Sequence, residues 1–241
     1  MRILLGPPGS PAPGSDIDDA QLRQVYAVPP DSSWLRVNFV STVDGAATGA
    51  DGLSGSINTE ADGRVFRVLR ELADVVVVGA GTVRAEQYTV LRDEDPTSPP
   101  LVVVSRTAEL PARVADMSSP AGSALLVTRH GADPAALERA RDILGSDNVI
   151  LAGDDEVDLL LMRKELERKG FRRILSEGGP SLFGSMLDAG IVDEVDLSLA
   201  PRVVGGSHPR IVRGGDLTVG LEPTVLVEEE GTVMGRWLVR R

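Results

Sequence analysis

A glutamate and a glycine pair separate an apolar run from a helical pattern in ILSEGGPSLFGS, residues 174–185. Gly178 and Gly179 suit a sharp strand-to-helix turn, and Pro180 suits the first turn of a helix. Free N–H groups at a helix start also favour an anion such as a pyrophosphate. Turn geometry does not account for Glu177, because an acid beside an anion site is unfavourable unless it binds something else. From this stretch alone, two interpretations remain: a structural turn and a phosphate-binding site.

Two further polar clusters directly follow apolar runs. GAGT, residues 79–82, comes after four valines. Its glycines let a ligand approach the backbone, and Thr82 can donate to a phosphate or ribose. An ordinary turn explains the same residues, and the third glycine of the dinucleotide fingerprint is missing. Ser105 and Arg106 follow LVVV. Arginine there suits an extra phosphate monoester and favours NADPH over NADH, unless it merely faces solvent.

Asp44 lies just beyond another apolar run, in STVDGAATG, and LSGS follows at 53–56. An Asp-Gly pair is also typical of a plain turn. Arg70 falls late in a helical pattern and Arg92 in a loop, so both could be surface charges. Because the carboxyl ends of parallel strands meet at one edge of a sheet, the shared placement of these clusters is more informative than any one of them.

The composition excludes several classes of protein. The chain has 241 residues and a formal net charge of -11, which argues against nucleic acid or an anionic membrane as the main partner. It has no cysteine and two histidines, so thiol catalysis, disulfides and a metal centre are not expected. No signal peptide or membrane-spanning segment is recognisable, and a cytoplasmic protein is predicted.

Hydrophobic periodicity predicts a chain of alternating strands and helices. The runs at 74–81 and 101–107 are continuous and β-branched, as in strands buried on both faces. The fold class is therefore α/β, a single domain with a mixed, mostly parallel sheet flanked by helices and with antiparallel strands near the C-terminus. The other expected strands are 35–41, 124–128, 148–152, 172–177, 194–206 and a hairpin over 223–240; the expected helices are 16–26, 59–73, 132–145, 156–170 and 180–190.

In order, STVDG, SGSI, LRELADVVVVGAGTVRAE, VVVSR and ILSEGGPSLFGSMLDAGIVDEVDLSLAPRVVGG resemble the reductase domain of bacterial riboflavin biosynthesis, the RibD C-terminal domain family. The resemblance runs from about Trp34 to the C-terminus. It implies a dihydrofolate reductase-like fold, a lead-in with a short helix over 1–33 and a reductase domain over 34–241. A deaminase domain, whose zinc ligands would include cysteines, is not expected.

The resemblance also implies a reaction, in which NADPH reduces a phosphoribosylamino-pyrimidine by hydride transfer to ribose C1′. Glu177 would accept hydrogen bonds from the pyrimidine, while Asp44, or a water it positions, would relay the proton to the ring oxygen. Substrate contacts are expected from Ser54, Arg70, Arg92 and Glu177, with the arginines at the 5′-phosphate. Cofactor contacts are expected from Val40, Ser56, Gly79, Gly81, Thr82, Glu86, Ser105, Arg106, Gly178, Gly179, Pro180, Ser181 and Leu182.

Two departures from the family pattern fall where the substrate and the nicotinamide are expected to bind. AEQYTVLRDED replaces the family's D-P-x-L-T stretch, with Glu86 in place of the acid, and Ser56 replaces a frequent tryptophan. A related reductase acting on a dihydropterin or dihydrofolate is therefore a second hypothesis, and a non-catalytic NADP-binding protein is a third. The resemblance further implies a homodimer, with the C-terminal strands as a reasonable interface.

Overall fold

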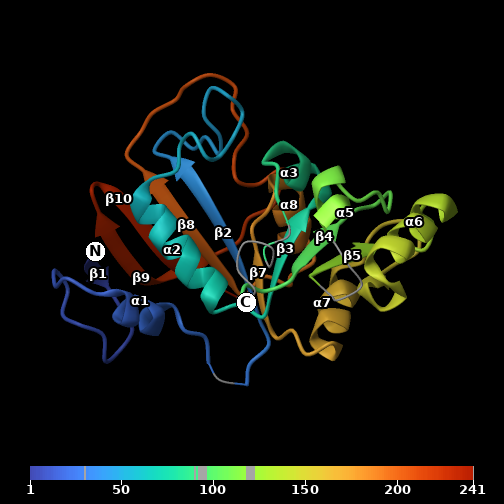
Figure 1. Ribbon diagram of the computed structural model, residues 1–241. Coiled ribbons are helices and arrows are strands. Elements are labelled where there is room, and N and C mark those ends of the chain that lie inside the picture. Colours follow the sequence, from blue (N-terminus) through green and yellow to red (C-terminus); the bar gives the residue numbers. More distant parts are fainter. Residues whose placement is uncertain (30, 90, 92–96, 118–122, 241) are drawn as a thin grey trace.

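The structure, a computed structural model, describes residues 1–29, 31–89, 91, 97–117 and 123–240. Its centre is a ten-stranded sheet in the order β1-β9-β10-β8-β2-β7-β3-β4-β5-β6 (Figure 1). The strands are β1 Arg2–Leu5, β2 Trp34–Thr42, β3 Val75–Gly79, β4 Leu101–Val104, β5 Ala124–Thr128, β6 Val149–Leu151, β7 Arg173–Ser176, β8 Glu194–Ala200, β9 Leu221–Glu229 and β10 Thr232–Val239. The helices are α1 Asp19–Tyr26, α2 Glu60–Glu71, α3 Ala80–Ala85, α5 Ala112–Met117, α6 Pro134–Leu144, α7 Leu159–Arg168 and α8 Pro180–Asp188, with a 3₁₀ turn at Ser146–Asn148.

The sheet is mostly parallel, as predicted. Strand β2 pairs in parallel with β7 and β8, and β3, β4, β5 and β6 continue the parallel arrangement from β7. Strands β10, β9 and β1 are antiparallel to their neighbours. The four valines at 75–78 are completely buried, which explains why their run is continuous rather than alternating. The predicted mixed α/β fold with antiparallel C-terminal strands is confirmed.

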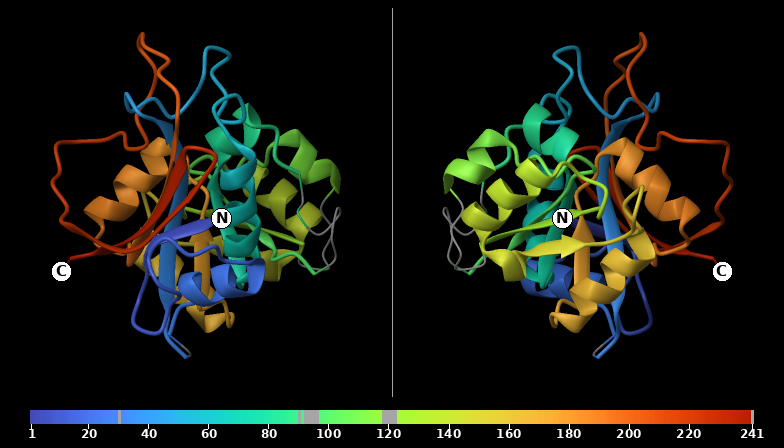
Figure 2. Two further views of the ribbon diagram at one scale, coloured as in Figure 1. Left: turned by 90° about the vertical axis from the view of Figure 1, so that its left-hand side faces the viewer. Right: turned by 90° about the vertical axis from the view of Figure 1, so that its right-hand side faces the viewer.

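Helices cover both faces of the sheet (Figure 2). On one face, α1, α2 and α6 contribute Leu22, Val65 and Leu137 to one apolar cluster. On the other face, α7 and α8 contribute Met162 and Phe183 to a second cluster. The spacing of the apolar residues located α1, α2, α6, α7 and α8, each of which buries one stripe of side chains against the sheet. The six-residue helices α3 and α5 were not predicted, and α3 begins within the run 74–81 that was expected to be a strand. None of the helices in the described ranges is long and apolar enough to cross a membrane.

Three predicted strands end two or more residues earlier than expected. Strand β3 stops at Gly79, β4 at Val104 and β8 at Ala200, not at residues 81, 107 and 206. Pro201 has no N–H to continue the ladder, and the chain beyond it forms a long loop to β9.

The N-terminal segment, expected to be a lead-in with a short helix, also contributes a strand to the sheet. Strand β1 pairs with β9, and Ile3 is completely buried. The turn-forming prolines and glycines of this segment bring residue 15 back to the strand, where the N–H of Ile3 donates to the carbonyl of Ser15 at 3.0 Å. The sequence did not predict this strand, because four residues give no reliable periodicity.

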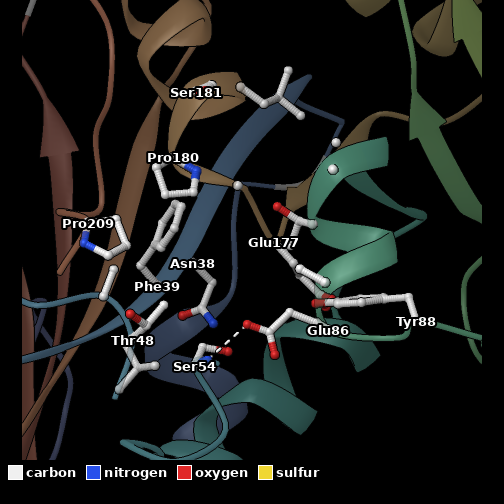
Figure 3. Close-up of a pocket in the computed structure, with 18 of the residues that line it drawn as sticks. Asn38, Phe39, Thr48, Ser54, Glu86, Tyr88, Glu177, Pro180, Ser181 and Pro209 are labelled. Atoms are coloured by element: carbon white, nitrogen blue, oxygen red, sulfur yellow. Dashed lines mark hydrogen bonds between the residues drawn. The ribbon is translucent and has the colours of Figure 1, made fainter. Parts of the chain in front are cut away.

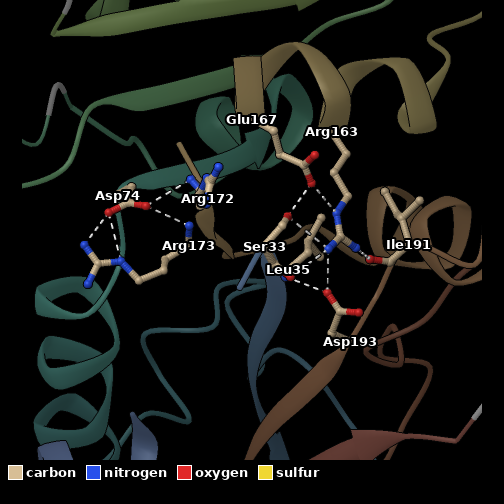
Figure 4. Close-up of polar contacts among 9 residues, drawn as sticks. All are labelled: Ser33, Leu35, Asp74, Arg163, Glu167, Arg172, Arg173, Ile191 and Asp193. Carbon is tan, nitrogen blue, oxygen red and sulfur yellow. Dashed lines mark hydrogen bonds and ion pairs between the residues drawn. The ribbon is translucent and has the colours of Figure 1, made fainter. Parts of the chain in front are cut away.

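A polar cluster closes the amino ends of the central strands (Figure 4). Arg163 of α7 donates to the carbonyl of Ile191 at 2.6 Å and to that of Ser33 at 3.1 Å. The same guanidinium forms ion pairs with Asp193 at 2.9 Å and with Glu167 at 3.0 Å. One side chain thus joins α7 to the segments that enter β2 and β8.

Replacing Arg163 with alanine is expected to lower the free energy of unfolding by about 3 kcal/mol, because it removes the cation that pairs with the buried side chain of Asp193 and the donor to two carbonyl groups. Denaturant titration measures the difference. Arg168→Ala on the same helix is the control. Its pair with Glu165 is exposed, so a loss below about 1 kcal/mol is expected. Equal losses in the two variants would contradict the assignment.

Candidate active site

A pocket of about 430 Å³ opens toward the carboxyl ends of β2, β3 and β7 (Figure 3). Phe39, Gly79 and Glu177 bring these three strands to its wall. The starts of α2, α3 and α8 and the loops over 47–58 and 201–220 complete it. Open parallel sheets bind ligands at this edge, so the predicted location agrees with the geometry.

Many of the residues predicted to bind a ligand line this pocket. They come from distant parts of the chain and meet because their strands are neighbours in the sheet. They are Val40, Ser54, Gly79, Gly81, Thr82, Glu86, Glu177, Gly179, Pro180, Ser181 and Leu182.

Two helices begin at the pocket with glycine as the N-cap residue. Gly79 caps α3 and Gly179 caps α8, and neither helix start receives a side-chain hydrogen bond. The free N–H groups of α8 are therefore available to an anion. The two helix starts are also closely packed, because a Cβ atom on Gly179 would lie 2.1 Å from Thr82 Oγ1. Glycine is required here for close approach.

Glu177 follows β7 and forms a bidentate ion pair with Arg70 of α2. Arg70 Nε lies 2.7 Å from Glu177 Oε1, and Arg70 Nη2 lies 2.8 Å from Oε2. The hydroxyl of Tyr88 donates to Oε2 at 2.9 Å. Burial raises the pKa of Tyr88, and the negative charge of Glu177 raises it further, so this phenol keeps its proton. The guanidinium also lies 4.2 Å from the centre of the Phe66 ring.

This arrangement changes the expectation for Arg70. The resemblance implied a contact with the substrate phosphate, whereas in the structure Arg70 holds the carboxylate of Glu177. Arg92, the other expected phosphate ligand, lies outside the described residues. The Glu86 carboxylate points toward the loop that carries Ser54 and accepts a hydrogen bond from the Ser54 N–H at 2.9 Å (Figure 3).

Asp44, the expected proton relay, joins two loops rather than lining the pocket. Its carboxylate accepts from the N–H groups of Gly205 at 2.8 Å and Val204 at 3.3 Å, and from the hydroxyl of Thr42. The hydrogen bond from Thr42, and then that from Gly205, lower the pKa of Asp44 to about 2. An acid this strong is ionised at neutral pH and cannot supply a proton there.

This link between the two loops is expected to depend on pH. Because the pKa of Asp44 is lower in the folded protein than its usual value, the link is complete above about pH 4 and is lost as the pH falls through about 2. The amide resonance of Gly205 should therefore titrate with a midpoint near 2. The same resonance should show no such titration in Asp44→Asn. A midpoint near 4 in the wild type would show that the carboxylate is not held.

The remaining predicted residues in the described part of the chain do not line the pocket. Ser56 Oγ donates to Asp51 at 2.7 Å, and Arg106 forms an exposed ion pair with Glu156 at 3.1 Å. Ser105 directly follows β4 and is buried. Gly178 has a φ of +91° and packs against the Phe39 ring, where a Cβ atom would lie 2.7 Å from Cζ. Gly178 thus shapes the turn, and its neighbour Gly179 lines the pocket.

Sequence reasoning missed several residues that line the pocket. Asn38 stands in the apolar run of β2 and reaches the pocket beside Phe39 (Figure 3). Asp62 and Phe66 lie on the face of α2 that also carries Arg70, four residues apart each time. Asp62 lies four residues before Phe66 and eight before Arg70, opposite the apolar face of the helix. This spacing could have indicated that α2 forms one wall of the pocket. Thr48, Pro209 and Arg213 come from loops, which give no periodic signal.

The sheet, the two glycine-capped helix starts and the acid at the strand end define an α/β protein with a pocket suited to a nucleotide cofactor and a second ligand. The chain belongs to the RibD C-terminal domain family, whose model matches residues 33–231. It is therefore a member of a family of reductases of the riboflavin pathway.

Named relatives agree with this membership. The chain is 35% identical over 187 residues to the 2,5-diamino-6-ribosylamino-4(3H)-pyrimidinone 5′-phosphate reductase of Methanothermobacter thermautotrophicus, covering 76% of this chain and 84% of the relative. The corresponding reductase of Archaeoglobus fulgidus is 28% identical over 194 residues, covering 76% of this chain and 87% of the relative. A pyrimidine reductase-like protein from Corynebacterium diphtheriae shares the fold, with a TM-score of 0.77 at 24% identity over 91% of this chain and 98% of that one.

Proposed function

We propose that this chain reduces a phosphoribosylamino-pyrimidine of riboflavin biosynthesis, such as 5-amino-6-(5-phosphoribosylamino)uracil, with NADPH as the reductant and ribose C1′ as the hydride acceptor. The observation that carries the proposal is the meeting of Glu177 with the uncapped start of α8 in one pocket. Relatives named as reductases of such a substrate support it.

The residues that line the pocket are of the types that bind a nicotinamide dinucleotide. The N–H groups at the start of α8 would hold the pyrophosphate, and Gly79, Gly179 and Thr82 leave room for the cofactor to lie against the backbone. When bound, the reduced nicotinamide supplies the hydride. Most of the rate acceleration is then expected from holding the ring against C1′.

Glu177 is proposed to bind the pyrimidine by accepting a hydrogen bond from it. A carboxylate offers about four acceptor positions, and among the described residues Arg70 and Tyr88 donate three hydrogen bonds to Glu177, so the fourth position is proposed to accept from an amino or ring N–H group. Arg70 then fixes the orientation of the carboxylate. Ser54, across the pocket, is proposed to contact the ribose phosphate part of the substrate.

The test is an NADPH oxidation assay with the deaminated phosphoribosylamino-pyrimidine and, in parallel, dihydrofolate. Turnover of the pyrimidine is expected. Turnover of dihydrofolate alone would support a pterin reductase on the same fold. If neither substrate is reduced and NADPH leaves the melting temperature unchanged, the chain is not a reductase, because a ligand that binds the native state must stabilise it.

We further propose that the protein works in the cytoplasm as a homodimer. Leu4 and Leu5 on the edge strand β1 and Leu221 at the start of β9 are more than a third exposed, which suits a contact between two copies. Light scattering on the purified protein measures the mass directly. A monomeric mass at micromolar concentration would exclude the dimer.

A further inference from the structure

The proposed reaction needs a proton as well as a hydride. Hydride transfer reduces C1′, the bond from C1′ to the ring oxygen breaks, and that oxygen becomes a hydroxyl only if it gains a proton. The oxidised nicotinamide keeps none to give. A group in the pocket must therefore be protonated at neutral pH and must reach the sugar.

Two of the carboxyl groups at the pocket are already committed to other partners. Both oxygens of Glu177 accept from Arg70, and the Tyr88 hydroxyl adds a third hydrogen bond. Glu86 Oε1 accepts from the Ser54 N–H. Asp44 lies in the adjoining loops with its pKa lowered to about 2. Glu177 and Glu86 therefore serve as hydrogen-bond acceptors, and Asp44 is ionised at neutral pH.

Asp62 has the opposite environment. It lies in the first turn of α2, it lines the pocket, and the residue is only 4% exposed. In the described part of the chain, none of the ion pairs involves its carboxyl group. A buried carboxylate without a cation is less stable than an exposed one, so this burial favours the neutral acid.

Asp62 also lies where a substrate bound by Glu177 would extend. Asp62, Phe66 and Arg70 share one face of α2 at intervals of four residues. Arg70 holds Glu177 at one end of this face, and Asp62 lies about 12 Å along the helix at the other. A pyrimidine bound by Glu177 would lie at the Arg70 end of this face, and its attached ribose would extend past Phe66 toward Asp62.

We propose, on the basis of the proposed function, that Asp62 is the acid of the reaction and donates its carboxyl proton to the ribose ring oxygen. Hydride reaches C1′, the bond from C1′ to the ring oxygen breaks, and the released oxygen takes the proton of Asp62. The resulting carboxylate regains a proton from water after the product leaves. Charge and atoms balance with one reduced nicotinamide and one proton consumed.

Burial raises the pKa of Asp62, and a hydrogen bond with Ser198 only partly opposes the shift. The neighbouring elements do not reverse it. Strand β8 carries the fully buried Asp196, whose own pKa is raised, first by burial and then by Glu194. Helix α1 presents Asp19, which is paired with Arg64. Among the described residues, Glu86, Tyr88, Glu177 and Arg213 line the same pocket, and the buried cations Arg36 of β2 and Arg236 of β10 are paired with Glu194.

Asp62→Asn tests the proposal, because the amide keeps the shape and can still bond to Ser198 but has no proton of this kind to give. We expect kcat to fall by about 100-fold or more, with KM changed less than about threefold. The wild-type rate should decline as the pH rises through the pKa of the acid, and the variant should lose this limb. Asp62→Glu should recover part of the rate. The control is Glu60→Gln, exposed in the same turn, which should match the wild type.

Infrared difference spectroscopy of wild type against Asp62→Asn gives a readout without substrate. A protonated carboxyl band at neutral pH that is missing in the variant is expected, and its absence from the wild type would overturn the proposal. So would an unchanged kcat with a raised KM, which would make Asp62 a binding group only. A wild type that reduces no pyrimidine would overturn the proposed function together with this role, whereas an active variant beside an active wild type would overturn only the role.

Discussion

Replacing Glu177 with glutamine is expected to lower kcat/KM for the pyrimidine substrate by about 100-fold while the cofactor still raises the melting temperature. The amide has one acceptor oxygen, so Arg70 loses one of its two hydrogen bonds, and the new NH₂ group faces guanidinium donors. Arg70 is then held less firmly against the pocket wall. Steady-state rates with both substrates varied measure the loss, and thermal shifts with NADPH measure cofactor binding.

The control for Glu177→Gln is Glu165→Gln on α7, where the glutamate makes an exposed pair with Arg168. That variant should keep the wild-type rate. If Glu177→Gln is folded and its kcat/KM stays within threefold, the carboxylate does not orient the substrate. If the cofactor shift disappears as well, the residue acts on both ligands, and its assignment to the pyrimidine alone is wrong.

The sequence located the sheet and one edge of the site because both depend on short-range patterns. The buried valines at 75–78 predict a central strand, and glycines directly after that strand and after β7 predict backbone turns at the same edge. Parallel strands then bring Thr82, Glu177 and Gly179 together without any further information. All three line the pocket.

Side-chain partners across the fold could not be predicted in the same way. Arg70 and Glu177 are 107 residues apart, and nothing in the local pattern of either indicates a bidentate pair. Asp44 illustrates the opposite case, since an acid after a strand suggests chemistry but here holds the amides of a loop 160 residues away. Strand β1 was missed because its stability comes from pairing with β9 rather than from its own four residues.

A second large effect is expected at the turn that shapes the site. Gly178→Ala should lower the free energy of unfolding by about 3 kcal/mol and the melting temperature by about 6–12 °C. The backbone φ of +91° is unfavourable for any residue with a Cβ atom, and that atom would lie 2.7 Å from the Phe39 ring. Phe39 cannot move freely, because it stacks on Phe183 of α8 with ring centres 5.3 Å apart.

Denaturant and thermal unfolding measure the effect of Gly178→Ala, and Gly215→Ala provides the control because a Cβ atom there meets open space. The control should differ from the wild type by less than about 0.5 kcal/mol. Because Phe39 lines the pocket and α8 begins directly after the turn, any displacement of the ring also shifts the proposed anion site. A variant that loses stability should therefore lose cofactor affinity too. If the variant is as stable as the wild type but binds the cofactor more weakly, the turn contributes to ligand binding and not to stability. If the variant is less stable but binds the cofactor normally, the Phe39 ring has moved away from the pocket without disturbing the site.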